Sequence, residues 1–156
     1  MADLLTHVLV AYAVGTLLAR RDWLPRRHVS VLLVGAVAPD AMKATVVLGV
    51  HRGTIAGIPY STWGYHTLGG VVLIAGLGAL TIRATDRWLA FRALLGGGVS
   101  HLLLDLLVIR ADGVAPPYLY PLSGWLPPAG NLYLSSDLWP PLVALCLAGV
   151  VALYDR

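Results

Sequence analysis

Histidine and aspartate stand four residues apart at two places in this sequence. His101 and Asp105 form one pair, and Asp3 and His7 form the other in the reverse order. Residues four apart project from the same face of an α-helix, about one turn from each other. An imidazole nitrogen and a carboxylate oxygen in that arrangement can bind the same divalent ion. Each pair therefore predicts half of a metal site.

Two more ionisable residues lie within or beside apolar segments. Asp40 follows Pro39 in the middle of the run 29–50, and His66 comes just before the run 68–82. An ionisable side chain inside a membrane span costs about 2.5–3.5 kcal/mol, so its presence calls for a function. Zinc is the divalent ion that a mixture of imidazole and carboxylate favours. We predict a metal site with the ligands His7, Asp40, His66, His101 and Asp105, and with Asp3 and His51 as further ligands or supporting residues.

These polar residues also have purely structural interpretations. A lone histidine in a membrane bundle can form an interhelical hydrogen bond, and Asp3 can cap the first helix. Lys43 can neutralise Asp40 as a buried pair. His28 lies in an arginine-rich segment, where we expect it to be solvated. The metal hypothesis therefore depends on the whole set of residues rather than on any one of them.

The composition indicates which elements must position these residues. Of the 156 residues, 58% are hydrophobic and only 12% are charged, whereas a soluble domain has roughly a quarter charged residues. This excludes a disordered chain, a coiled coil and an ordinary soluble domain, and the length fits one integral membrane domain over residues 1–156. Five apolar runs approach the length of a membrane span: 4–19, 29–50, 68–82, 88–109 and 138–154.

The runs predict an all-α fold, a polytopic membrane bundle of about five transmembrane helices. The second helix should be broken at Pro39, because proline lacks the backbone donor and clashes with the preceding turn. Four arginines fall within 20–27 and two within 83–87, so alternate connections are basic. The positive-inside rule makes that side cytoplasmic, which predicts an inner-membrane protein with its N-terminus outside and its C-terminus in the cytoplasm. These arginines indicate topology and not a nucleic-acid-binding surface.

Several short motifs resemble those of a known family. Gly98-Val99-Ser100-His101, with Asp105 four residues on and Tyr120-Pro121-Leu122 further along, resembles the G-x-S-H-x-x-x-D…P-[LF] signature of the YdjM-like family of inner-membrane metal-dependent hydrolases. Thr6-His7, Pro39-Asp40 and Tyr65-His66-Thr67 resemble further motifs of that family, which is distantly similar to zinc-dependent phospholipase C. Met42 and Lys43 stand where the family has a second Asp and a His.

The resemblance implies hydrolysis of an ester or phosphoester bond, with Asp40 and His101 as the catalytic residues. All five predicted ligands fall in the outer half of the expected bundle, which favours a phospholipid or lipid-linked substrate. Arg52 is expected to bind the phosphate of that substrate. The alternative is a non-enzymatic membrane protein, in which the same residues pass protons or metal ions, or serve only a structural or adaptor role.

Overall fold

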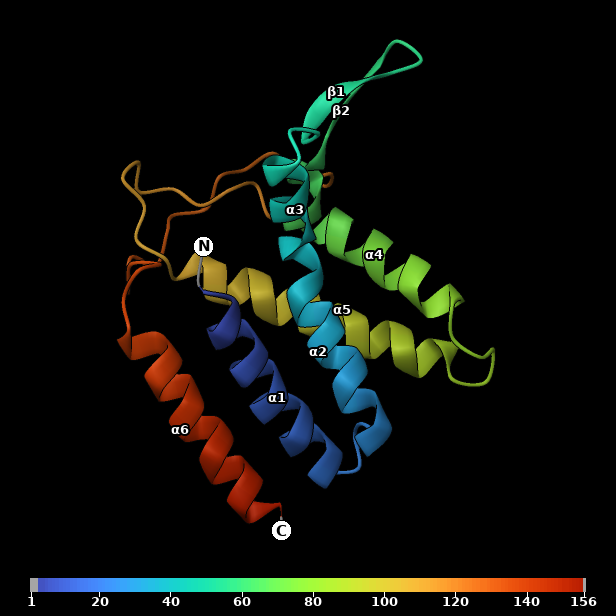
Figure 1. The fold of residues 1–156 in the computed structure, drawn as a ribbon, viewed down its shortest axis with the longest axis vertical. Coiled ribbons are helices and arrows are strands. Elements are labelled where there is room, and N and C mark those ends of the chain that lie inside the picture. The colour runs from blue at the N-terminus through green and yellow to red at the C-terminus, as the bar shows by residue number, and fades with distance from the viewer. Residues whose placement is uncertain (1–2, 156) are drawn as a thin grey trace.

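The computed structural model describes residues 3–155, most of which are helical (Figure 1). Within this range the α-helices are α1 (Leu4–Arg20), α2 (Val29–Val37), α3 (Met42–Val47), α4 (Leu68–Leu80), α5 (Arg87–Leu106) and α6 (Trp139–Tyr154). Three short 3₁₀-helices accompany them: η1 (Arg26–His28), η2 (Ala38–Ala41) and η3 (Thr62–His66). The strands β1 (Arg52–Ile55) and β2 (Ile58–Ser61) form an antiparallel hairpin.

The second apolar run is interrupted at Pro39, as the sequence predicts. The α-helix α2 ends at Val37, the 3₁₀ turn η2 carries Pro39 and Asp40, and α3 continues the run from Met42. A proline cannot donate to the preceding turn and its ring displaces that turn, so the regular helix ends before it. The interruption places Asp40 in a buried bend between two helical segments.

Two helical stretches are long and apolar enough to cross a membrane. They are Arg26–Val47, which has 22 residues and includes the Pro39 turn, and Arg87–Leu106, which has 20. The other apolar helices, α1, α4 and α6, have 17, 13 and 16 residues. At 1.5 Å per residue, the shortest reaches only about 20 Å, less than the roughly 30 Å of a hydrocarbon core. The expected apolar helices are therefore present, but only two of them meet the length expected of a span.

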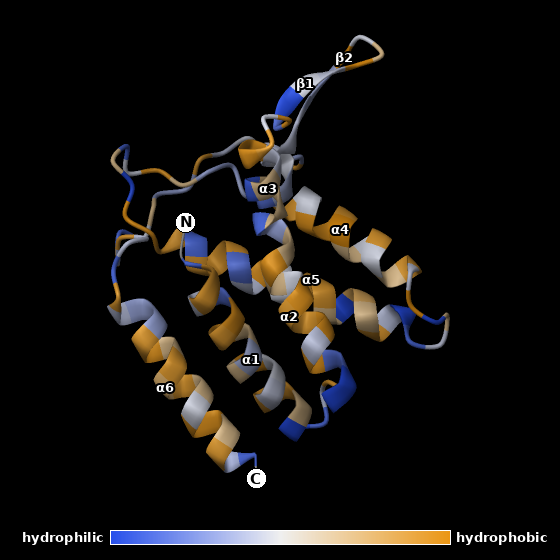
Figure 2. Cartoon of the chain, viewed as in Figure 1, coloured by the Kyte–Doolittle hydropathy of each residue, from blue (hydrophilic) through white to orange (hydrophobic). Residues whose placement is uncertain are grey.

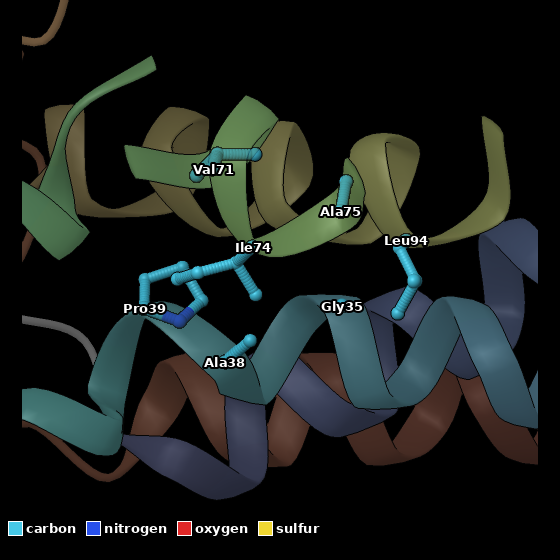
Figure 3. Close-up of a pocket in the computed structure, with 7 residues that line it drawn as sticks. All are labelled: Gly35, Ala38, Pro39, Val71, Ile74, Ala75 and Leu94. Carbon is cyan, nitrogen blue, oxygen red and sulfur yellow. The ribbon is translucent and has the colours of Figure 1, made fainter. Parts of the chain in front are cut away.

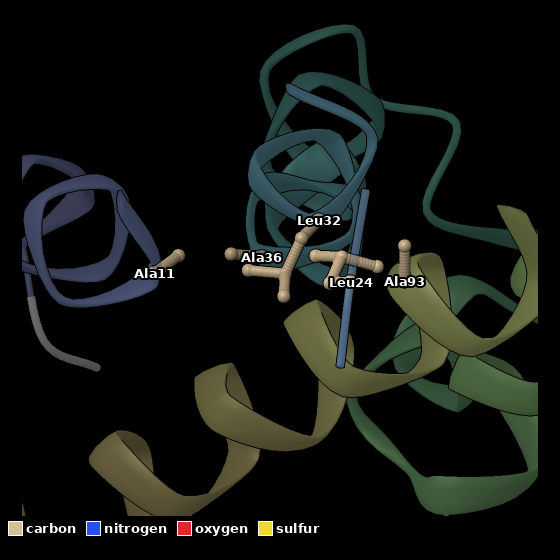
Figure 4. Close-up of a cluster of buried hydrophobic side chains, with 5 residues drawn as sticks. All are labelled: Ala11, Leu24, Leu32, Ala36 and Ala93. Carbon is tan, nitrogen blue, oxygen red and sulfur yellow. The ribbon is translucent and has the colours of Figure 1, made fainter. Parts of the chain in front are cut away.

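Helices α2 and α5 cross at backbone contact. A Cβ atom on Gly97 would lie 2.0 Å from the carbonyl oxygen of Leu32, and one on Gly35 would lie 2.2 Å from the carbonyl oxygen of Leu94. Only glycine permits so close an approach of two helices. Around the crossing, small residues and two leucines form a buried cluster of Ala11, Leu24, Leu32, Ala36 and Ala93 (Figure 4). This crossing fixes α2 against α5 one turn before His101.

The basic connections meet at one end of the bundle. Arg26 of η1 pairs with Asp155 through two hydrogen bonds of 2.6 and 2.8 Å, and Arg27 pairs with Asp86 at 2.9 Å. These pairs join η1 to the end of α6 and to the α4–α5 connection, where hydrophilic residues gather in Figure 2. The start of α1 and the end of α5 lie at the other end, beside the irregular segment 110–137 (Figure 1).

The turn between β1 and β2 lies at the tip of the hairpin and projects away from the helices (Figure 1). Ala56 and Gly57 have φ angles of 51° and 81°, which are the two positive values that a two-residue hairpin turn requires. Ile55 and Ile58 flank this turn and are 68% and 70% exposed. Nothing in the sequence analysis predicted a hairpin here, although an Ala-Gly pair between β-branched residues is the signal that was available.

Candidate metal centre

The five residues predicted as ligands come from four separate elements and meet in the structure. His7 lies near the start of α1, Asp40 in η2, His66 at the end of η3, and His101 and Asp105 near the end of α5. They are buried, with exposed fractions of 0% for His7, His101 and Asp105, 4% for His66 and 7% for Asp40. Their ligand atoms form two groups that share His101, one with His7 and Asp105 and one with Asp40 and His66. We call these five residues the His/Asp cluster.

Two imidazole nitrogens of the His/Asp cluster have carboxylate oxygens around them at distances close to those in a metal coordination shell. His66 Nε2 lies 3.3 Å from both Asp40 Oδ1 and His101 Nε2, and His101 Nε2 lies 3.7 Å from Asp40 Oδ1. Asp105 Oδ2 is 3.7 and 3.8 Å from the Nε2 atoms of His101 and His66. Ligands about 2.0–2.1 Å from a tetrahedral ion are about 3.4 Å from one another. The Nε2 atoms of His66 and His101, taken with a carboxylate oxygen of Asp40 or of Asp105, are therefore spaced to within a few tenths of an ångström of such a shell.

His101 is held in one tautomer by α2. Its Nδ1 lies 2.7 Å from the carbonyl oxygen of Ala36. Because a carbonyl oxygen only accepts hydrogen bonds, Nδ1 carries the proton and donates it. The lone pair is then on Nε2, the nitrogen that faces Asp40 and His66. Metal-binding histidines characteristically have their second nitrogen fixed in this way.

His7 contacts the cluster from the side of α1. Its ring stacks on that of His101, with centroids 3.8 Å apart and planes 11° apart. Its Nε2 lies 3.4 Å from Asp105 Oδ1, whereas the other oxygen of that carboxylate faces His66 and His101. His7 therefore orients Asp105 and belongs to the group of ligand atoms that His101 and Asp105 complete.

The residues present fit a divalent ion. Within residues 3–155, both ring nitrogens of His7, the Nδ1 of His66 and the Oδ1 of Asp40 are buried without a hydrogen-bond partner. A buried polar group left unsatisfied costs about 1–3 kcal/mol, so a native fold keeps such groups where something else satisfies them. Imidazole nitrogens and carboxylate oxygens are ligands of zinc and of other divalent ions, so this set of donor atoms suits such an ion.

Lys43 approaches the cluster at Asp40. Its Nζ lies 2.5 Å from Asp40 Oδ2, and its side chain is 46% exposed. The two oxygens of Asp40 therefore face different partners, Oδ2 the ammonium group and Oδ1 the imidazoles. The pairing of Lys43 with Asp40 that we considered from sequence is present, at the edge of the protein rather than in its interior.

Other candidates lie apart from the His/Asp cluster. Asp3 is the N-cap of α1 and accepts the backbone N–H of Thr6 at 2.9 Å. His51 precedes β1, and its carbonyl oxygen accepts the backbone N–H of Thr62. Arg52 begins the hairpin, where it is exposed. Neither Asp3 nor His51 belongs to the two groups of possible ligand atoms found among residues 3–155.

The expectation that His28 is solvated was wrong. Its exposed fraction is 3%, because η1 folds it back beneath the start of α2. The arginines beside it, Arg26 and Arg27, point to solvent and reach Asp155 and Asp86. A charged sequence neighbourhood therefore did not indicate the burial of this histidine.

Two tyrosines of the segment 110–137 support the end of α5, and the sequence analysis did not single them out. The Tyr133 hydroxyl donates to the Leu104 carbonyl oxygen at 2.8 Å, directly before Asp105. Tyr118 is buried and its hydroxyl accepts from Arg110 at 3.5 Å. Burial raises the pKa of both Tyr118 and Tyr133 to about 12. Both hydroxyls therefore keep their protons at neutral pH.

A cavity beside η3 reaches the His/Asp cluster at His66. It has a volume of about 380 Å³ and its lining includes His66, Trp63 and Tyr120. The seam between η2 and α4 is closed instead, because it contains a gap of only about 10 Å³. Apolar residues surround that gap: Gly35, Ala38, Pro39, Val71, Ile74, Ala75 and Leu94 (Figure 3). Access to the cluster is therefore from the side of η3 and the segment 110–137.

Comparison of the chain with family models, with curated proteins and with solved structures finds no match. The function must therefore be argued from the geometry of the cluster and its surroundings.

Proposed function

We propose that this protein is a membrane-embedded metal-dependent hydrolase that cleaves a phospholipid or a lipid-linked phosphoester. The observation that carries the proposal is that the buried Nε2 atoms of His66 and His101 lie 3.3 Å apart, and that each lies 3.3–3.8 Å from a carboxylate oxygen of Asp40 and of Asp105. The motif resemblance to the YdjM-like hydrolases supports the same reaction, and kinship with that family is part of the proposal.

The outer surface of the helices supports a membrane location. Helix α6 packs against α1 and exposes a series of large apolar side chains to the outside. Figure 2 shows the same apolar character along α1 and α4. A soluble monomer rarely exposes so large a contiguous apolar area. We therefore propose that all five apolar stretches cross the membrane, the shorter ones with their flanking residues at the interface, and that the arginine-rich end is cytoplasmic.

The residues of the cluster would have different roles in such a reaction. A bound divalent ion supplies Lewis acidity and lowers the pKa of a coordinated water towards neutrality. Asp40, His66, His101 and Asp105 would hold that ion, with Ala36 orienting His101 and His7 orienting Asp105. Asp40 and His101 are the proposed catalytic residues, because their ligand atoms lie within 4.8 Å of that of His66, which lines the access cavity. The low polarity around them strengthens each charge interaction.

The shape of the access cavity favours a lipid substrate. Trp63 and Tyr120 line it and are 47% and 55% exposed. Trp and Tyr are enriched where a membrane meets water, because each has an apolar ring and a polar atom. A lipid headgroup lies at this level of a bilayer and can enter the cavity sideways, whereas a soluble substrate would have to leave water.

The experiment that tests the proposal measures metal and turnover together. Purified wild-type protein should contain a stoichiometric divalent metal and hydrolyse a lipid phosphoester in mixed micelles, with activity lost on chelation. His101→Ala and Asp105→Ala should lose the metal while their circular dichroism remains helical. Stoichiometric metal in both variants would contradict the ligand assignment.

One observation favours a second candidate function, a proton or metal-ion pathway. His7, His101 and Asp105 have exposed fractions of 0%, so the part of the cluster nearest α1 is enclosed. Enclosed chains of titratable groups serve as relays in transport proteins. A soluble chromogenic phosphoester offered beside the lipid substrate separates the candidates. Turnover of neither substrate by metal-loaded protein would favour the pathway.

A further inference from the structure

Lys43 is the only lysine of the chain, and it is next to the proposed metal centre. Its Nζ lies 2.5 Å from Asp40 Oδ2, while Oδ1 of the same carboxylate is 3.3 Å from His66 Nε2. A single carboxylate group therefore separates the ammonium charge from the ligand atoms. Lys43 also follows the Pro39 turn directly on α3, which limits how far its backbone can move away.

The ammonium group of Lys43 has unused hydrogen-bonding capacity. A lysine ammonium donates three hydrogen bonds. Within the described part of the chain, Asp40 accepts one of them and no other acceptor contacts Nζ. The side chain is 46% exposed, so solvent and dissolved anions can approach it. An anion that enters the centre would thus meet a fixed cation whose position Asp40 already determines.

The His/Asp cluster can hold few ions, and this limit indicates a function for the ammonium group of Lys43. Both groups of ligand atoms include His101, whose Nδ1 donates to Ala36. His101 therefore has one lone pair, on Nε2, and can bind one ion at a time. Enzymes with two metal ions use the second to stabilise charge on the phosphoryl oxygens. A centre with one ion needs another source of that positive charge.

We infer that the centre binds one divalent ion and that Lys43 binds the anionic group of the substrate beside it. This inference rests on the proposed function and identifies the substrate as an anion. Lys43 replaces Arg52, which we expected from sequence to bind phosphate. Arg52 is exposed on the hairpin, and no side chain in residues 3–155 holds it near the cluster. Arg110 is directed to the Tyr118 hydroxyl. Lys43, in contrast, forms an ion pair with Asp40 of the cluster.

The test measures binding of inorganic phosphate to the full-length, metal-loaded protein by titration calorimetry. It compares wild type with Lys43→Met, Lys43→Arg, Arg52→Met and Arg83→Met. Arg83 lies in the connection before α5 at the other end of the bundle and is exposed, so Arg83→Met is a matched loss of one positive charge. Metal content per chain is determined for each variant by mass spectrometry.

We expect one ion per chain in every variant. Lys43→Met should weaken phosphate binding roughly 10- to 100-fold, the effect of losing a hydrogen bond to a charged group. Lys43→Arg should restore most of the affinity, and Arg52→Met and Arg83→Met should bind phosphate as wild type does. Activity on the lipid substrate should follow phosphate affinity through KM.

Four other outcomes would overturn the inference. Unchanged phosphate affinity in Lys43→Met would show that Lys43 does not bind the anion, while the metal centre would stand. Loss of the ion in Lys43→Met would show that Lys43 only neutralises Asp40. Two ions per chain would contradict the inference that the two groups of ligand atoms, which share His101, cannot both be occupied. A wild-type protein that takes up no ion would overturn both this inference and the proposed function.

Discussion

The crossing of α2 and α5 should control metal affinity without contributing a ligand. In Gly97→Ala, the new Cβ would meet the carbonyl oxygen of Leu32 at 2.0 Å, whereas an ordinary contact is at least 3.4 Å. The two helices must therefore separate by about 1.4 Å at this point. Both contacting atoms belong to helices held by their own hydrogen bonds, so neither can rotate away as a flexible side chain would.

This displacement is large enough to break the hydrogen bond between His101 Nδ1 and the carbonyl oxygen of Ala36. The Nδ1–O distance is 2.7 Å, and a hydrogen bond is lost beyond about 3.5 Å. Ala36 lies one turn beyond Leu32 on α2, and Asp40 lies one turn beyond Ala36. We expect Gly97→Ala to weaken metal binding about 10- to 100-fold, the effect of losing a supporting contact to a ligand. Overpacking should also destabilise the fold by about 1–3 kcal/mol.

Competition with a fluorescent chelator measures the metal affinity, and thermal unfolding followed by circular dichroism measures the stability. Gly96→Ala is the matched control, because it lies next to Gly97 on the same helix and its Cβ would be 4.0 Å from the nearest atom, in Leu32. Gly96→Ala should retain metal affinity and gain up to about 1 kcal/mol of helix stability. Equal metal affinity in the two variants would refute the argument that this crossing positions the centre.

Three further predictions concern other parts of the chain. The topology is tested by replacing Trp23 or Leu122, which are 65% and 84% exposed, with cysteine in a Cys146→Ala background. The two cysteines should be labelled from opposite sides of the membrane, the one at position 122 from outside. Labelling of both from the same side would refute the topology. Asp3→Ala should lose about 1 kcal/mol of stability with its N-cap but retain metal, and loss of metal would make Asp3 a ligand. Folding raises the pKa of Tyr118 and Tyr133 to about 12, from an ordinary value near 10, so the folded protein binds these two protons more tightly than the unfolded chain does. Absorbance at 295 nm should therefore show two tyrosines that ionise at higher pH than the others. The free energy of unfolding should fall between about pH 10 and pH 12.

The sequence was informative where a local rule determines the structure. Proline alone is sufficient to predict the interruption at Pro39, and the spacing of His101 and Asp105 places both on one face of α5. Apolar runs predicted the position of each long helix to within a few residues. The meeting of Asp40, His66 and His7 with α5 was a hypothesis from composition, because their contacts depend on how helices pack.

Features that depend on tertiary contacts could not be predicted in this way. The carbonyl oxygen of Ala36 fixes His101, yet every residue has such an oxygen and none carries a sequence signal. His28 is buried by the fold of η1 although its neighbours are charged. The pairing of Lys43 with Asp40 is local and could be considered from sequence, whereas the exposed position of Arg52 on a hairpin could not.

The origin of the ligands in four elements has a consequence for the order of events in the cell. Only His101 and Asp105 are close in sequence; the others reach them when α1, η2 and η3 have packed against α5. A nascent chain that ends before α5 lacks both of these residues. It then has only the other three ligands, His7, Asp40 and His66, of the proposed metal centre. For the proposed metal centre, uptake of the ion must therefore follow the packing of these elements, and the ion would be drawn from the compartment that faces the finished centre. The supply in that compartment, as well as the ligands themselves, would then determine which metal the proposed centre holds.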